Sequence, residues 1–345
     1  MGFMNLTECD LCKKNECGCA TKVASYFLLL ENAAKRVSTP NLTSSTDLKP
    51  DACIDKLTFE LRTFLSAHEL VARVKGLGIT ISSTRLRDRR YYYQIGSGSE
   101  CIYVNHPFDP HHPITRVITR PSAFSSFGEY QNFLATIFTE EELNSFRVTR
   151  TDLAVNYPQE FEKLVEGLDC KNKRANVEYI SKGAKRTGLM LGSGNERFVI
   201  YDHQVKHDGH SPKTRIECQL KGSKCPVRDY SEIGKLPERI SFKNPFDAVQ
   251  LKNINLKPDE WFETNAEKEK LKELSTLVRH EGFLAARKKL NTHKNFQRDY
   301  QRFFEAEPIT QQPNLIIENY LTNYFHKEEK WKSQRKRSKQ TNSMA

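Results

Sequence analysis

Alternation of apolar and polar residues marks a series of β-strands in the first 220 residues of the chain. The clearest strand is Lys213–Lys221, which alternates apolar residues with polar ones: Ile216, Cys218 and Leu220 against Arg215, Glu217, Gln219 and Lys221. Successive side chains of a strand point to opposite faces, so this segment predicts one core face and one polar face. A polar face that holds a carboxylate between cations is a candidate site.

The predicted elements follow a similar order in two halves of the chain. The first half predicts strands Ile54–Arg62, Arg90–Ile95, Cys101–Val104 and Ile114–Arg120, with a helix that begins at a capping box on Ser66 and a second helix at Gly128–Phe138. The second half predicts a helix from Pro158 to about Gly167 and strands Arg147–Asn156, Val177–Ser181, Thr187–Leu191, Arg197–Tyr201 and Lys213–Lys221. We therefore expect an α+β fold, an antiparallel sheet built from two similar βαβ-type units.

The letters of the two halves also correspond. IGSGSECIYVNH parallels LGSGNERFVIYD, and Gly96 follows Asp55 by 41 positions where Gly192 follows Asp152 by 40. These matches suggest an internal duplication. In this alignment Asn105 stands where the second unit has Tyr201, and Ile118 stands where it has Glu217. If the duplication is real, only the second unit kept the chemistry.

From about Val227 onward the pattern changes to one rich in Glu, Lys, Leu and Phe. It predicts helices at Asp259–Leu274, Ser275–Leu290, Lys294–Glu305 and Asn314–Lys332, followed by a basic end too polar to bury. We expect four parts: an appendage at 1–50, a sheet domain at 51–246 with possible units at 54–138 and 147–235, a helical region at 247–330, and a basic disordered tail at 331–345.

The composition favours a polyanionic partner. Lys and Arg number 54 against 43 Asp and Glu, which gives a formal net charge of +11 and a pI near 9.1. This balance favours nucleic acid first and an anionic membrane surface second, with an ordinary basic soluble protein as the alternative. No apolar run approaches the ~20 residues that span a bilayer, and the start of the chain lacks a signal-peptide pattern. We expect a cytoplasmic protein that does not enter a membrane.

Cysteines and histidines offer possible metal ligands. Five of the nine cysteines are scattered singly, which is typical of a reducing compartment. The other four form a cluster of unusual spacing that predicts either a zinc site or a disordered terminus with free thiols: Cys9, Cys12, Cys17 and Cys19. His203, His207 and His210 resemble a metal cluster, but the Gly and Pro residues beside them favour solvated histidines in a loop.

Two carboxylates lie on polar strand faces. Asp152 shares a face with Arg150, Ala154 and Asn156, just as Glu217 shares one with Arg215. If these strands are neighbours in one antiparallel sheet, the carboxylates converge, and their oxygen ligands suit Mg²⁺ or Mn²⁺. The alternative is that Asp152 and Glu217 form cross-strand pairs with Arg150 and Arg215.

Tyr201 ends the strand that lies between these two in sequence. A tyrosine hydroxyl is a poor nucleophile until a cation stabilises its phenolate, and Arg197 and Lys206 are local candidates. A metal held by Asp152 and Glu217 would polarise a phosphate under attack. The set suits phosphodiester transesterification, in which the tyrosine becomes linked to a DNA phosphate and a ribose hydroxyl leaves. The alternative for Tyr201 is a packing role at the strand end.

The strings RTDLAVNY, LGSGNERFVIYD and TRIECQLKG, in this order, resemble the rolling-circle replication initiators of small plasmids and filamentous phages, often called Rep_trans-like. The resemblance covers roughly Ile54 to Phe246. It implies a relaxase-type endonuclease that nicks one strand at an origin, keeps the 5′ phosphate on its tyrosine and leaves a 3′ hydroxyl to prime DNA replication. By position, Tyr201 matches the nicking tyrosine, and Glu217 and Asp152 match the metal-binding carboxylates.

The resemblance also implies plasmid or phage origin DNA, a host helicase and a homodimer as partners. Its phosphate-binding cations would be Arg150, Arg197, Lys206, Arg215 and Lys221. The sequence departs from the family after the tyrosine, where His203 and Lys206 replace the usual lysine and glutamate. This departure leaves a DNA-binding regulator without cleavage as the alternative. Tyr157 and Tyr179 are the next candidate nucleophiles, and a zinc-binding adaptor is a third hypothesis.

Overall fold

The computed structural model describes residues 49–61, 65, 67–85, 91–105, 114–171, 176–183, 185–206, 214–290 and 296–326. Several predictions from the sequence lie outside the described residues: the N-terminal cysteine cluster, the capping serine Ser66, His207, His210, the side chain of Lys206 and the basic tail. No helix in the described ranges is long and apolar enough to cross a membrane.

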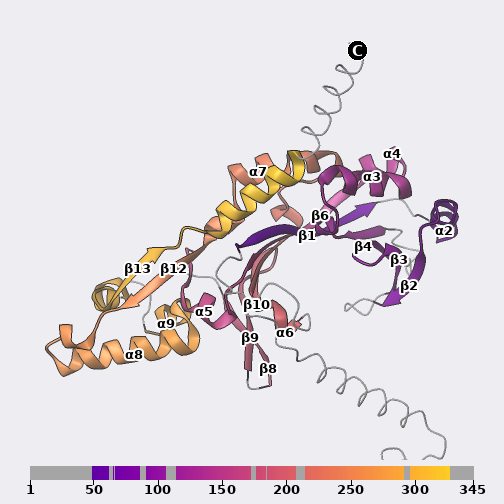
Figure 1. The fold of residues 1–345 in the computed structure, drawn as a ribbon. Helices are drawn as coiled ribbons and strands as arrows, with labels where there is room; N and C mark the ends of the chain where they lie inside the picture. The colour runs from indigo at the N-terminus through magenta and orange to yellow at the C-terminus, as the bar shows by residue number, and fades with distance from the viewer. Residues whose placement is uncertain are drawn as a thin grey trace, which may run out of the picture. The chain divides into compact units, whose positions relative to one another are not determined.

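A ten-stranded antiparallel sheet forms the body of the molecule (Figure 1). The strands are β1 Asp51–Leu61, β2 Ile81–Arg85, β3 Tyr91–Ser97, β4 Glu100–Asn105, β5 Thr115–Thr119, β6 Arg147–Tyr157, β8 Val177–Lys182, β9 Lys185–Ser193, β10 Glu196–Asp202 and β11 Thr214–Lys221. Outward from β1 the order is β5, β4, β3, β2, and outward from the neighbouring β6 it is β11, β10, β9, β8. The expected mixed α+β fold with an antiparallel sheet is therefore confirmed.

One face of this sheet packs into the main apolar core. Ile216, Cys218 and Leu220 of β11 are buried, as the alternation of this strand predicts. The core is covered by α3 Phe127–Ile137, α4 Glu140–Ser145, α7 Leu236–Phe242 and the helix at residues 313–326, all on the same side of β1 and β6 in Figure 1. Aromatic rings take part in this core, with Phe59 of β1 stacked on Phe146 at 5.6 Å between ring centroids. The opposite face of the sheet carries the polar side chains.

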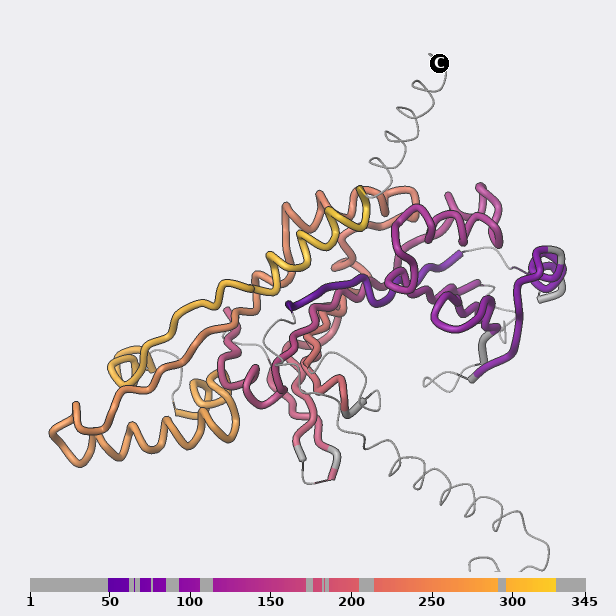
Figure 2. Tube along the Cα trace, viewed as in Figure 1, coloured from indigo at the N-terminus to yellow at the C-terminus, as the bar shows by residue number. Residues whose placement is uncertain are grey.

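The region after residue 247 is not wholly helical, which corrects the expectation from the sequence. β12 Val249–Leu256 pairs with β7 Leu168–Cys170 on one side and with β13 Phe304–Pro308 on the other. Between β12 and β13 lie α8 Asn265–Glu281, α9 Phe283–Leu290 and α10 Phe296–Tyr300 (Figure 2). The sequence pattern missed these strands because β12 pairs with residues about 50 and 80 positions away, and no local signal encodes such pairing.

The predicted helix break between Leu274 and Ser275 is also wrong. α8 continues to Glu281 and ends at Gly282, whose φ is +85°. A Cβ at this position would collide with the carbonyl of Val165 in the neighbouring α5 (Phe161–Glu166), so only glycine fits.

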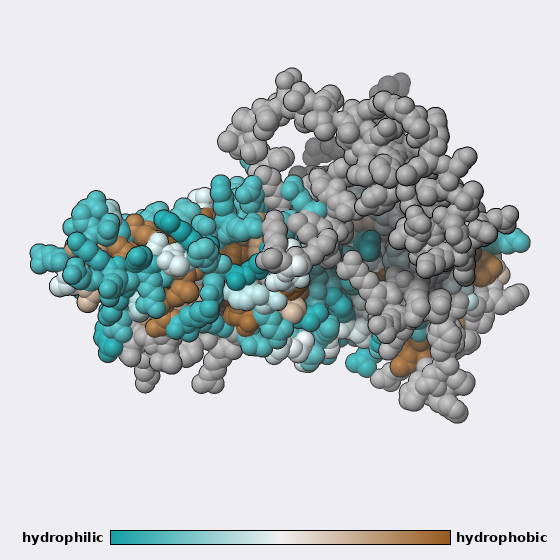
Figure 3. Space-filling view, turned by 90° about the horizontal axis from the view of Figure 1, so that it is seen from below, coloured by the Kyte–Doolittle hydropathy of each residue, from teal (hydrophilic) through white to brown (hydrophobic). Residues whose placement is uncertain are grey.

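The surface of the described residues seen from below is mainly hydrophilic, with small separate apolar areas (Figure 3).

Candidate active site

Three neighbouring strands, β6, β11 and β10, place polar side chains in register on the face opposite the apolar core. Antiparallel pairing aligns Tyr201 with Arg215 and Asn156, then Arg197 with Gln219 and Asp152, and finally Lys221 with Arg150. Successive side chains of a strand point to opposite faces, so every second residue of each strand lies on this face. The polar faces predicted for β6 and β11 therefore lie side by side, as the convergence of Asp152 and Glu217 requires.

A β-bulge brings a third carboxylate, Asp55, into the site. In the β1–β6 ladder Ile54 pairs with Leu153 and Lys56 pairs with Asp152, so Asp55 is an extra residue between them. Such bulges bend a strand and redirect a side chain. Asp55 accepts a hydrogen bond of 2.7 Å from Nη1 of Arg215, which places its carboxylate on the site face.

Asp55, Asp152 and Glu217 form an acidic cluster. Each offers a carboxylate oxygen, and the three oxygens lie within 4.8 Å of one another. Burial raises the pKa of Asp152, the charge of Glu217 raises it further, and Arg150 and Lys56 oppose the rise. Crowded, buried carboxylates of this kind could hold a divalent metal ion, because hard cations prefer oxygen ligands.

Cations also contact this cluster directly. Arg150 donates Nε and Nη2 to the two oxygens of Asp152 at 2.7 and 2.6 Å, and Lys56 Nζ lies 3.7 Å from the same carboxylate. The pairing of Arg150 with Asp152 was one alternative from the sequence, and it is present, but between two residues of β6 rather than across strands. The other alternative was a pair of Arg215 with Glu217. It is absent, because Arg215 contacts Asp55 and Asn156 instead.

Tyr201 lies beside the acidic cluster. Its hydroxyl donates to Oε2 of Glu217 at 3.4 Å, and the side chain is 6% exposed. Burial raises the pKa of Tyr201, the charge of Glu217 adds to the rise, and Arg215 opposes it. The phenol therefore stays protonated unless a further positive charge is bound near its hydroxyl. His203 stacks on the Tyr201 ring with 6.1 Å between centroids.

A hydrogen-bond chain links Glu217 to a cation on β10. Gln219 Nε2 donates to Oε1 of Glu217 at 2.6 Å, and Arg197 Nε donates to Oε1 of Gln219 at 2.7 Å. The amide therefore fixes one oxygen of Glu217 and leaves the other facing Tyr201. Sequence reasoning placed Gln219 on this face but gave it no role.

Most of the residues predicted for the site come together in the structure. Asp152, Glu217, Tyr201, Arg150, Arg197, Arg215 and Lys221 share one sheet face. The alternative tyrosines lie elsewhere, because the buried Tyr157 donates to the carbonyl of Gln311 and Tyr179 donates to that of Glu281. Asp55 and Lys56 were missed. The match between the spacings of Asp55 and Asp152 was a signal for Asp55, whereas nothing in the sequence marks the bulge.

The counterpart region of the first half lacks this chemistry. Asn105 holds the backbone of neighbouring β5 through its side chain, which donates to the carbonyl of Ile114 and accepts from the amide of Arg116. Arg116 forms an ion pair with Glu60 at 2.7 Å. Within the part of the chain that the structure describes, the Asp55, Asp152 and Glu217 group is the one set of three potential metal ligands.

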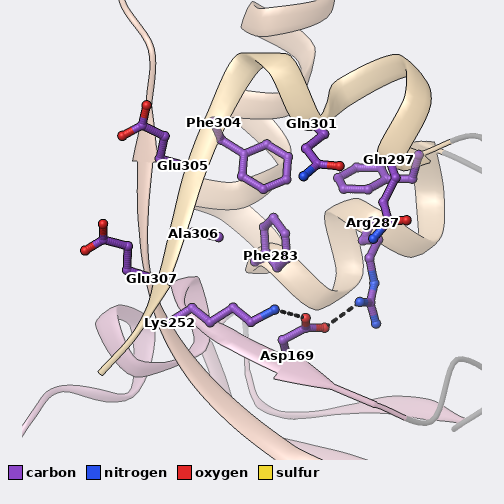
Figure 4. A pocket seen from close by; sticks show the side chains of 11 residues that line it. Asp169, Lys252, Phe283, Arg287, Gln297, Gln301, Phe304, Glu305, Ala306 and Glu307 are labelled. Carbon is purple, nitrogen blue, oxygen red and sulfur yellow. Dashed lines mark hydrogen bonds and ion pairs between the residues drawn. The ribbon is translucent and has the colours of Figure 1, made fainter. Parts of the chain in front are cut away.

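A polar pocket of about 490 Å³ lies between α9, α10 and β13 (Figure 4). Asp169 of β7 is its buried carboxylate, paired with Lys252 of β12 at 2.7 Å and with Arg287 of α9 at 2.8 Å. The amide of Cys170 donates to Asp169 as well. These ion pairs therefore join α9 to the β7–β12 ladder.

No family model matches the sequence, and no curated protein matches it. Among solved structures, the chain is similar to a rolling circle replication initiator protein from Geobacillus stearothermophilus, at 12% identity and a TM-score of 0.34, over 69% of this chain and 99% of that chain. It is also similar to the PH1012 protein from Pyrococcus horikoshii OT3, at 9% identity and a TM-score of 0.11, over 56% of this chain and 94% of that chain.

Proposed function

We propose that this chain is a rolling-circle replication initiator, a relaxase-type enzyme that nicks one strand of plasmid or phage origin DNA. The observation that supports this most is the Tyr201 hydroxyl, 3.4 Å from a carboxylate of a three-carboxylate cluster. The strand order, symmetric about β1 and β6, supports two related βαβ-type units, of which only the second carries the nucleophile.

The acidic cluster would hold Mg²⁺ or Mn²⁺ through Asp55, Asp152 and Glu217. A bound cation would supply Lewis acidity to the phosphate under attack and positive charge beside Tyr201. Arg150 and Arg215 now neutralise Asp152 and Asp55. In this proposal the same guanidinium groups turn part of their hydrogen-bonding capacity to phosphate oxygens of the DNA backbone, a geometry that arginine favours.

The chemical step is a transesterification at phosphorus. The Tyr201 proton passes to the Glu217 oxygen that the hydroxyl already faces, and Oη forms a bond to the phosphorus. The bond between phosphorus and O3′ breaks, and O3′ takes its electron pair and a proton from solvent water to become a free 3′ hydroxyl. The DNA keeps a 5′ phosphotyrosine link, so the energy of the phosphodiester is conserved for rejoining.

The basic side chains and partners complete the proposal. Arg197, Arg215 and Lys221 lie on the same face as Tyr201 and would contact the DNA backbone, and Lys206 is proposed for the same role on sequence grounds alone. A host helicase would unwind the duplex from the nick, and a homodimer would supply a second nicking subunit. These partners follow from the proposed function.

Nicking of supercoiled DNA tests the proposal. A supercoiled plasmid that carries the DNA flanking this gene, incubated with the protein and Mn²⁺, is expected to become an open circle with protein attached covalently. Tyr201→Phe is expected to abolish both products. Tyr103→Phe is the matched control, because Tyr103 lies on the same sheet face in the first half. This substitution is expected to leave nicking unchanged. Tight binding without nicking would favour the DNA-binding regulator instead.

A further inference from the structure

Four cations gather on the site face, two in the row of Asp152 and two in the row one step beyond it. Lys56, Arg150, Arg197 and Lys221 come from four neighbouring strands, β1, β6, β10 and β11. Lys221 and Arg150 are paired across neighbouring strands and form one row. In the next row Gln219 lies between Arg197 on one side and Asp152 and Lys56 on the other. We call this group the cation cluster. It lies at the end of the site away from Tyr201.

The positive charge of the cation cluster exceeds the negative charge that faces it. Asp152 is paired with Arg150 and Lys56, and Arg197 is bonded to the neutral amide of Gln219. In the described ranges no acidic group forms an ion pair with Arg197 or Lys221. Burial lowers the pKa of Lys221, and the charges of Arg150 and Arg197 lower it further. Like charges held together with too few counter-ions destabilise the ligand-free protein, and an anionic ligand removes that cost.

The position of the cation cluster relative to the acidic cluster points to a backbone phosphate. A two-residue step along a strand covers about 7 Å. Arg150 lies one such step from Asp152, and Lys221 lies one such step from Gln219, and both steps lead toward the same end of the sheet. This separation is close to that of neighbouring phosphates along an extended DNA strand. The oxygens of Asp152 and Glu217 lie within 4.8 Å of each other, and the Tyr201 hydroxyl faces Glu217. A strand whose scissile phosphate lies over these oxygens would place its next phosphate among the cations.

We propose that the cation cluster is a dedicated site for the phosphate adjacent to the scissile one, and that it sets which phosphate reaches Tyr201. The proposal rests on the proposed function, because it assumes that the ligand is a single DNA strand. Arg197 acts here as a positioning residue. Its link through Gln219 to Glu217 couples the bound phosphate to the carboxylate that faces the nucleophile.

The test measures DNA binding without cleavage. A single-stranded oligonucleotide that the protein selects from a random pool is bound by the Tyr201→Phe protein in the absence of divalent metal. Each phosphate in turn is replaced by a neutral methylphosphonate. One position is expected to weaken binding about tenfold in the Tyr201→Phe protein. The same replacement is expected to have no further effect when Lys221→Met is added, because the cation that reads this phosphate is gone.

Lys224→Met provides the matched control, because Lys224 lies three residues further along the chain and forms an ion pair with Glu196 at 3.2 Å. Lys221→Met is expected to lower the slope of log affinity against log salt by about one, and Lys224→Met to leave it unchanged. Equal effects of the two substitutions, or no phosphate coupled to Lys221, would overturn the proposal. If phosphate coupling is present but the parent protein never nicks, the proposed function fails and the phosphate site stands.

Discussion

Asp55 reaches the acidic cluster because β1 contains one residue more than its partner strand at that point. In a regular strand Asp55 and Lys56 would point to opposite faces, yet Lys56 and Asp55 both contact polar groups of the site. The bulge thus supplies a carboxylate and a cation from adjacent positions. At the scale of single residues, the site depends on this irregularity as much as on Asp152 and Glu217.

We predict that Asp55→Asn weakens Mn²⁺ binding at least about tenfold, since an amide oxygen carries no charge to offset the cation. Glu217→Gln is expected to have a similar effect. Glu60→Gln is the control, because Glu60 lies on the same strand but pairs with Arg116 in the first half. Calorimetric titration with Mn²⁺ measures all three. If Asp55→Asn binds the metal as tightly as the parent protein, the bulge has no part in a metal site.

At the scale of elements, α2 (Ala67–Gly76) and α4 are joined by a forked ion pair. Arg73 donates to both oxygens of Glu142, at 2.8 and 3.1 Å. Glu142 also closes the capping box of α4, where it accepts from the amide of Thr139. Burial alone would raise the pKa of Glu142, but these hydrogen bonds outweigh it and lower the pKa below the ordinary value of 4.5.

A lowered carboxylate pKa contributes stability above the ordinary pKa, and this contribution is lost as the pH falls through the folded-state pKa. We therefore predict that Glu142→Gln lowers the melting temperature at pH 7. The difference from the parent protein should shrink as the pH falls below 4.5. Thermal melts across this range provide the measurement. A difference that stays constant down to pH 3 would show that the charge of Glu142 is not the cause.

The strands β7 and β12 and the helix α9 meet at the buried carboxylate of Asp169. Asp169→Ala would leave Lys252 and Arg287 without their counter-charge, and loss of one partner of a buried ion pair costs about 3–5 kcal/mol. Because Lys252 and Arg287 are about one-fifth exposed, we predict the lower end of this range in the free energy of unfolding by urea. Glu305→Ala is the control, since the exposed Glu305 pairs with Lys257 across 3.6 Å, and we expect a change below about 0.5 kcal/mol.

At the scale of the whole molecule, local alternation was enough to predict the face on which each main site residue lies. Ile216 and Cys218 are buried, and Glu217 points to the opposite face, because a strand allows no other arrangement once one face is apolar. The antiparallel pairing of β6 with β11 was a hypothesis from the sequence, and the structure has it.

The features that the sequence did not predict depend on contacts distant along the chain. β12 and β13 are strands because they pair with each other and with β7, and β7 itself is only three residues long. The residues of the helix at 313–326 that face the sheet enter its main core, including Ile317 and Leu321. The proposed domain boundaries stay predictions, as do the roles of the site residues.

The most direct test of the central claim is the identity of the residue that becomes linked to DNA. The protein is incubated with Mn²⁺ and a supercoiled plasmid that carries the DNA flanking its gene, then digested with nuclease and protease and examined by mass spectrometry. We predict one peptide that carries a 5′ nucleotide phosphate on Tyr201, and none from the Tyr201→Phe protein. Nicked DNA with the adduct on another tyrosine, or binding with no nick at all, would contradict the account.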